Sequence, residues 1–85
     1  MNTIFLLMAE YETASIPLSM IADKYLGMKP ETAAVRANEG ALPIPTFRLA
    51  DSNKAPRMIH LQDLAEFIDH QRAIARQELK KCQVK

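Results

Sequence analysis

Apolar residues recur along the chain at spacings that predict a mainly helical protein. Between residues 18 and 26 they return at every third or fourth position, which places them on one face of a helix. A second stripe of this kind begins near Leu61 and predicts a long final helix. The short apolar run Ile4–Met8 predicts a helix over residues 3–12 with Thr3 as its N-cap, although a strand also fits so short a run.

Prolines and glycines mark where these elements begin and end. Residues 30–39 form a predicted helix that opens on a proline and closes before a glycine, a few residues after the preceding helix. Residues 13–16 read as a turn, and two prolines exclude helix after the third element. Residues 46–49 alternate like a half-buried strand, and residues 58–60 predict its return strand. Residues 45–60 are therefore expected to form a β-hairpin.

The order of these elements is helix, helix–turn–helix, hairpin and long helix. Two helices joined by a tight turn and followed by a hairpin are typical of a winged helix-turn-helix. We therefore predict a single DNA-binding domain over residues 1–85, mainly α with a small β-hairpin. Residues 70–85 are expected to form a C-terminal helical extension of it.

Alanines fill the interior of the predicted helix at residues 30–39. These alanines are Ala33, Ala34 and Ala37. Small residues would let this helix approach the preceding one closely, so that the alanines would pack under Ile21, Ala22 and Tyr25. A recognition helix needs such a close approach on one side while its other side faces a DNA groove. An ordinary helical hairpin fits the pattern equally well, because alanine is also the best helix former. Under the DNA-binding interpretation, arginine can bind guanine and the methyl groups of Thr and Val can contact thymine. The candidate residues on this helix are Lys29, Glu31, Thr32, Val35 and Arg36.

Three cations surround the predicted hairpin and could act as a DNA-binding wing. Arg48, Lys54 and Arg57 would lie against phosphate groups or in the minor groove. The alternative is that they are the ordinary exposed charges of a hairpin tip. The winged helix-turn-helix order favours the first interpretation.

Composition narrows the class of protein. With 85 residues the chain makes one modest core and no enclosed, water-free cleft, and the balance of 48% hydrophobic to 25% charged residues is that of a globular protein. The net charge is only +1, but residues 29–60 carry five cations and three carboxylates.

The single cysteine fits a reducing compartment. The run Ile4–Met8 lacks the flanks of a signal peptide and is too short for a membrane span. We expect this run to be a core segment of a cytoplasmic protein.

No group of residues in the sequence predicts catalysis, a metal or a cofactor. His60 and His70 are the only histidines, and nothing forces them together with the acidic residues near them. Cys82 has no histidine at a spacing that would activate it. Phosphate loops and paired CxxC motifs are absent from the sequence. An enzyme is therefore the least supported class.

The final helix continues beyond the part needed to cover the domain. Ile74, Ala75 and Leu79 extend its apolar stripe with little of the domain left to bury them. This end is either a solvated helix or a surface that pairs with a second copy. Pairing is favoured, because DNA-binding proteins of this size usually need two recognition helices. We expect a homodimer joined wholly or partly through residues 70–81, with the apolar segment Ile4–Met8 as the alternative interface.

The sequence resembles known winged-helix proteins. Similarity to excisionase and MerR-type domains is carried by IPLSMIADKYLGMKPETAAVRANEGALPIPTFRLADSNKAPRMIHLQDLAEFIDHQR. More closely, MNTIFLLMAEYETASIPLSMIADKYLG together with HLQDLAEFIDHQRA resembles the pyocin activator protein PrtN family. This resemblance implies a transcriptional activator of prophage or phage-tail-like bacteriocin genes that binds double-stranded DNA, with RNA polymerase as a further partner. It also implies a bacterial protein that is associated with the nucleoid when bound to DNA. An excisionase-like architectural factor and an anti-repressor-type protein-interaction module are the alternatives.

Overall fold

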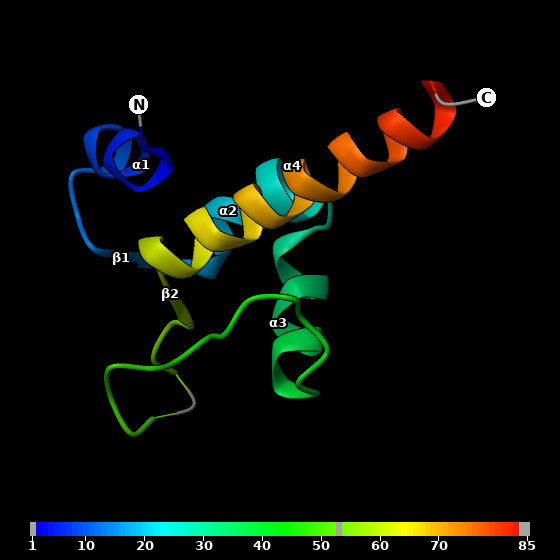
Figure 1. Ribbon diagram of the computed structural model, residues 1–85. Helices are drawn as coiled ribbons and strands as arrows, with labels where there is room; N and C mark the ends of the chain where they lie inside the picture. Colours follow the sequence, from blue (N-terminus) through cyan, green and yellow to red (C-terminus); the bar gives the residue numbers. More distant parts are fainter. Residues whose placement is uncertain (1, 53, 84–85) are drawn as a thin grey trace.

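The computed structural model of the chain describes residues 2–52 and 54–83. Four helices and two short strands follow one another in the order α1 (Thr3–Tyr11), β1 (Ser15–Pro17), α2 (Leu18–Leu26), α3 (Pro30–Asn38), β2 (Met58–His60) and α4 (Leu61–Gln83) (Figure 1). The architecture is mainly helical with a two-stranded antiparallel sheet, which confirms the predicted fold class. Among the described residues, no helix is long and apolar enough to span a membrane.

The first helix forms where the sequence predicts it, but it is capped differently. The side chain of Asn2 accepts a hydrogen bond from the Ile4 N–H at 2.9 Å, so Asn2 and not Thr3 is the N-cap. Thr3 is already helical, and its hydroxyl donates to Asp69 Oδ1 of α4 at 2.7 Å. The prediction missed this because asparagine and threonine are both good N-caps and stand side by side.

The helix–turn–helix follows the prediction closely. After α2 the chain turns at Gly27, whose φ of +66° lies in the left-handed region. The Met28 N–H then donates to the Ala22 carbonyl at 3.1 Å, which satisfies one of the last carbonyls of α2. Pro30 opens α3 only three residues after Gly27. The two helices are therefore neighbours in space as well as in sequence.

The sheet differs from the prediction. Strand β2 pairs with β1 in antiparallel register, with Ile16 opposite Ile59. The sequence instead predicts a turn over residues 13–16, and that prediction is wrong for Ser15 and Ile16, which belong to β1. The expected strand at residues 46–49 is reduced to one bridge, in which Phe47 and Met58 exchange two backbone hydrogen bonds of 3.0 and 2.7 Å. Strand β2 therefore lies between β1 on one edge and Phe47 on the other. Burial explains why β2 pairs with β1, because the paired side chains Ile16 and Ile59 are only 2% and 0% exposed.

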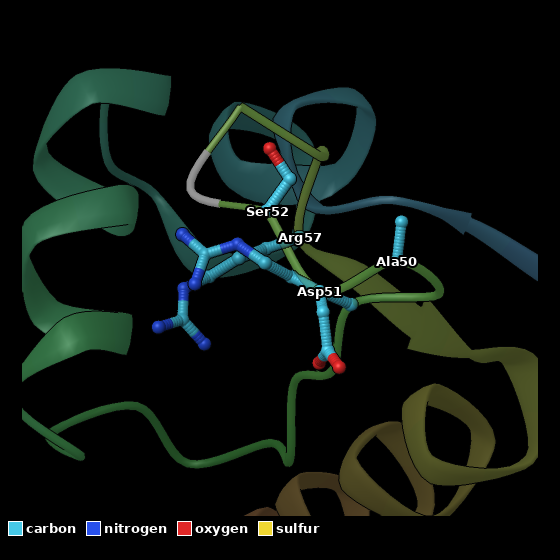
Figure 2. A pocket seen from close by; sticks show the side chains of 5 residues that line it. Ala50, Asp51, Ser52 and Arg57 are labelled. Atoms are coloured by element: carbon cyan, nitrogen blue, oxygen red, sulfur yellow. The ribbon is translucent and has the colours of Figure 1, made fainter.

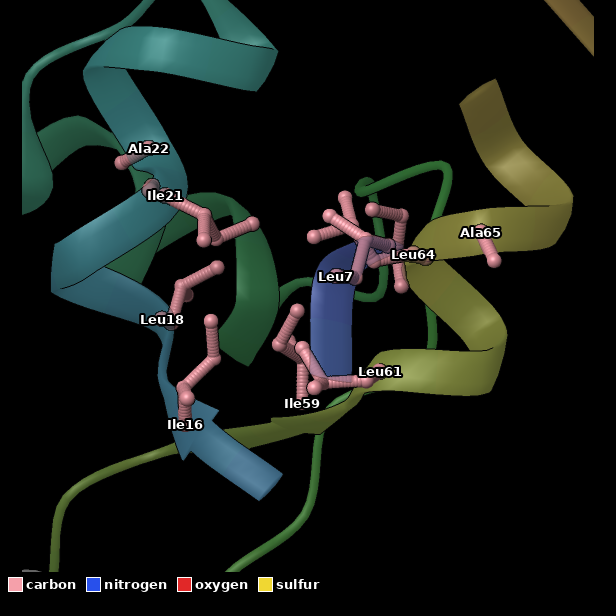
Figure 3. Packing of buried hydrophobic residues seen from close by; sticks show 11 residues of the cluster. Leu7, Ile16, Leu18, Ile21, Ala22, Ile59, Leu61, Leu64 and Ala65 are labelled. Atoms are coloured by element: carbon pink, nitrogen blue, oxygen red, sulfur yellow. The ribbon is translucent and has the colours of Figure 1, made fainter. Parts of the chain in front are cut away.

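One apolar cluster joins all the elements (Figure 3). Its fully buried large side chains are Ile21, Ile59, Leu61 and Leu64, which come from α2, β2 and α4. Helix α1 contributes Leu7 to this cluster, but Phe5, Leu6 and Met8 are exposed. The expectation that the run Ile4–Met8 is a core segment is therefore wrong for most of the run. A short helix lying on one side of the core buries only one of its faces.

Helix α4 begins on the core and continues past it. The Gln62 N–H donates to His60 Nδ1 at 3.0 Å, so His60 caps the start of the helix. Every described residue from Asp69 onward is exposed. The radius of gyration of 14.9 Å consequently exceeds the ~12 Å expected for a compact chain of this length.

Candidate nucleic-acid interface

Helix α3 presents one side to the core and the other to solvent. Ala33 is fully buried, and Ala37, one turn later on the same side, packs against the core cluster. Ala34 is exposed, so the expectation that all three alanines pack under α2 is wrong for Ala34. The physical reason is helical geometry, because successive residues point about 100° apart and only the i, i+4 pair shares a face.

The predicted groove-facing residues lie on the outer side of α3. Thr32 and Arg36 are exposed, and Val35 keeps 55% of its surface in solvent. Glu31 lies in the first turn, where its carboxylate complements the helix dipole, and Lys29 is the N-cap residue.

A segment that we call the wing, residues 45–52 and 54–60, lies beside α3 (Figure 1). Its central cation is Arg57, whose side chain reaches from the wing toward α3 (Figure 2). Nε and Nη2 of Arg57 donate to Asn38 Oδ1 at 3.2 and 2.6 Å. Nη1 donates to Thr46 Oγ1 at 3.0 Å. The guanidinium group therefore joins the C-terminal end of α3 to the beginning of the wing.

The side chains of Arg48 and Lys54 make fewer hydrogen bonds to the described residues than that of Arg57 does. Arg48 donates through Nε to the Ala55 carbonyl at 3.1 Å, and within the described residues neither of its Nη atoms has a protein acceptor. Lys54 is exposed, and among the described residues its one hydrogen bond runs from its backbone N–H to Ser52 Oγ. These two side chains have charged donors left for a ligand, whereas most of the donors of Arg57 are used within the protein.

Two open concavities lie along the wing, and only the second of them also involves α3. One is lined by Arg48, Ala50, Asp51, Ser52 and Arg57 (Figure 2). The carboxylate of Asp51 points away from the Arg57 guanidinium, and over residues 2–52 and 54–83 no ion pair involves either arginine. The second concavity is a groove that includes Ala34, Asn38, Arg48 and Arg57. Ala34, misplaced by the sequence prediction, thus forms part of the floor between α3 and the wing.

The structure therefore brings some predicted site residues together and keeps others apart. Arg48 and Arg57 line the same concavity, while Thr32, Val35 and Arg36 lie on the outer side of α3. Asn38 and Thr46 were missed, because their role depends on a guanidinium group 19 and 11 residues away in the chain. Ile74, Ala75 and Leu79 lie on the exposed part of α4, away from this interface (Figure 1).

The histidines and the cysteine have no part in the interface. His60 caps α4, and His70 is exposed on the same helix. Cys82 is a free, exposed thiol near the end of α4. No three potential metal ligands converge anywhere in the part of the chain that the structure describes.

Comparison with known proteins gives one match. Neither curated proteins nor solved structures match the chain. The sequence profile of one family, described as Pyocin activator protein PrtN, matches residues 3–75, which include all six elements except the end of α4. The family is regulatory and is not an enzyme class. The chain belongs to the pyocin activator protein PrtN family.

Proposed function

We propose that the chain is a sequence-specific DNA-binding activator of prophage or phage-tail-like bacteriocin genes. Family membership supports a regulator of pyocin genes, and the DNA-binding mode is our proposal. The observation that carries it is the pairing of an exposed helix, α3, with a basic wing fixed to it through Arg57. A helix and a neighbouring wing at a set distance can contact a groove and the adjacent backbone at the same time.

Helix α3 would enter the major groove with its outer side. Arg36 can bind guanine through two parallel hydrogen bonds, and the methyl groups of Thr32 and Val35 can contact thymine. Covering Val35, which is 55% exposed, would also remove apolar surface from water. Glu31 would face away from phosphate groups or accept a hydrogen bond from cytosine.

The wing would hold the DNA backbone next to α3. Arg48 has free guanidinium donors and Lys54 has a free ammonium group, so both can neutralise phosphates. Lys29 at the start of α3 would add a third cation near the backbone. Arg57 contributes differently, because its donors already bond to Asn38 and Thr46.

Two copies of the chain would bind two half-sites in double-stranded DNA. The exposed positions Ile74, Ala75 and Leu79 on α4 are the surface through which we expect the copies to associate. An activator bound in this way would leave part of its surface free for RNA polymerase.

Footprinting across the genomic neighbourhood of the gene tests this proposal. Protection at promoters is the expected result. Arg36→Ala should need a higher protein concentration to give it, whereas Lys81→Ala, which removes an exposed cation far from α3, should not. Circular dichroism should show that both variants remain folded. Protection at an attachment site would instead indicate an excisionase-like architectural factor. No protection anywhere would indicate a protein-interaction module and overturn the proposal.

A further inference from the structure

The outer face of α1 is apolar over its whole width. Leu7 points into the core, so the residues opposite it and on both its flanks face solvent. Phe5, Leu6 and Met8 are 63%, 52% and 46% exposed, and Ala9 is exposed as well. No polar side chain separates these four residues. A contiguous apolar face of this kind on a small protein indicates a contact surface.

The C-terminal end of α1 is acidic. Glu10 and Glu12 lie at the end where the helix dipole is negative, and the last turn of α1 holds no basic residue. Lys24 of α2 lies 3.4 Å from Glu10, and this hydrogen bond raises the pKa of Lys24. Glu12 has no cation within ion-pair distance among residues 2–52 and 54–83. Further positive charge would therefore be favourable here.

The free end of α4, residues 70–83, has the complementary properties. It runs away from the rest of the molecule (Figure 1) and exposes Ile74 and Leu79 at 37% and 57%. Its charged residues are four cations and one carboxylate, namely Arg72, Arg76, Lys80, Lys81 and Glu78. Two free ends packed against each other would therefore place eight cations in one interface. Such an arrangement is opposed by charge repulsion.

Three of these cations continue the edge of α4 that holds α1. Asp69 accepts the hydrogen bond from Thr3 at the start of α1. Arg72, Arg76 and Lys80 follow Asp69 at intervals of three and four residues, so they lie on the same edge. This edge is covered by α1 as far as Asp69, and beyond Asp69 it is free.

We propose that two copies of the chain associate reciprocally, with the free end of each α4 lying on the outer face of the other copy's α1. Ala75 and Leu79, which lie one turn apart on one face of α4, would cover Phe5, Leu6 and Met8, while Arg76 and Lys80 would approach Glu10 and Glu12. The 14 residues of the free end extend ~21 Å, enough to cover the ~14 Å of a nine-residue helix. A two-fold axis makes the same contact twice.

This inference rests on the homodimer of the proposed function, but it does not depend on DNA binding. It can therefore be tested by sedimentation of the free protein. One variant reverses α1, with Glu10→Lys and Glu12→Lys. The other reverses α4, with Arg76→Glu and Lys80→Glu. A matched control, Asp23→Lys with Glu39→Lys, reverses two exposed carboxylates elsewhere.

The reciprocal arrangement makes a specific prediction for these variants. Each reversed variant alone should show a dimer dissociation constant raised at least tenfold, because both of its contacts join like charges. An equimolar mixture of the two should dimerise again, since each contact then joins opposite charges. The control should behave as the unchanged chain does. Circular dichroism of each variant establishes that it is folded.

Four results would overturn the arrangement. The first is an unchanged chain that is monomeric at tens of micromolar concentration. The second is an α1-reversed variant that still dimerises, and the third is an α4-reversed variant that does so. The fourth is a mixture that stays monomeric although both variants are folded. A dimer that passes all these tests yet gives no footprint would refute the proposed DNA binding and leave the reciprocal contact intact.

Discussion

Removing the Arg57 side chain should weaken DNA binding without removing a phosphate contact. Arg57 makes three hydrogen bonds that join the wing to α3, two to Asn38 and one to Thr46. Each is worth about 0.5–1.5 kcal/mol net, and the two to Asn38 are exposed, so we expect the whole contact to stabilise the relative position of wing and helix by about 1–3 kcal/mol. In Arg57→Ala the wing would no longer be held against α3. Binding of cognate DNA would then have to restore that order.

Double-mutant analysis measures this contact directly. Arg57→Ala and Asn38→Ala should each lower the free energy of unfolding and the cognate affinity. The double variant should lose little more than Arg57→Ala alone, because the same hydrogen bonds are removed. The measurements are denaturant unfolding and DNA titration over a series of salt concentrations. The slope of affinity against salt should be nearly the same for all four proteins, since a positioning contact releases no counterions from DNA.

A phosphate-binding Arg57 predicts a different result. Arg57→Ala would then flatten the salt dependence by about one unit of slope, and Asn38→Ala would leave DNA affinity unchanged. That pair of outcomes would refute the positioning role. Arg57→Lys separates the cases further, because lysine keeps the charge but cannot form the two parallel bonds to Asn38.

Four more substitutions test other parts of the interface. Gly27→Ala should destabilise the protein by about 1–2 kcal/mol in denaturant unfolding, because φ is +66° while an added Cβ meets no atom within 4 Å. Ala33→Leu should cost about 1–3 kcal/mol by overpacking the contact between α2 and α3, and DNA titration should show lost affinity as well. Arg36→Ala should lower cognate affinity by about 1–3 kcal/mol and relax base preference at one position in a binding-site selection. Lys54→Ala should weaken binding to cognate and scrambled duplexes alike and flatten the salt dependence by about one unit, whereas a changed base preference would contradict its assignment to phosphate.

Helices were predictable from the sequence because their signals are local. The start of α3 at Pro30, the left-handed turn at Gly27 and the apolar stripe of α2 all depend on residues within a few positions of one another. The bounds Leu18–Leu26 agree with the predicted helix for this reason. The long α4 was equally visible, because its stripe repeats over several turns.

The sheet was not predictable in the same way. Strand β1 has three residues, and one of them is proline, so no alternating pattern can be read from it. Its partner is more than 40 residues away, and what selects that partner is the shared burial of Ile16 and Ile59. The local candidate, the segment around Phe47, keeps only a single bridge. Long-range burial therefore decided the pairing against the nearer alternative.

The sequence predicts which cations belong to the candidate site, but it does not predict what each of them does there. Arg48, Lys54 and Arg57 could be grouped by their position in one segment rich in turn-forming residues. The sequence does not show that Arg57 reaches Asn38, because the contact depends on how far α3 lies from the wing. That distance is fixed by tertiary packing.

Two contacts of opposite character hold α3 in place. On one side Ala33 is fully buried against the core, and this contact contributes to folding. On the other side the guanidinium of Arg57 holds Asn38 in a largely exposed setting, where each hydrogen bond adds only about 0.5–1.5 kcal/mol net. The small side chain of Ala33 lets α3 pack closely on the core, and the hydrogen bonds of Arg57 hold the wing beside α3. Substitutions at either position should therefore lower both the free energy of unfolding and the DNA affinity, those at Ala33 by disturbing the packing of α3 and those at Arg57 by releasing the wing from α3.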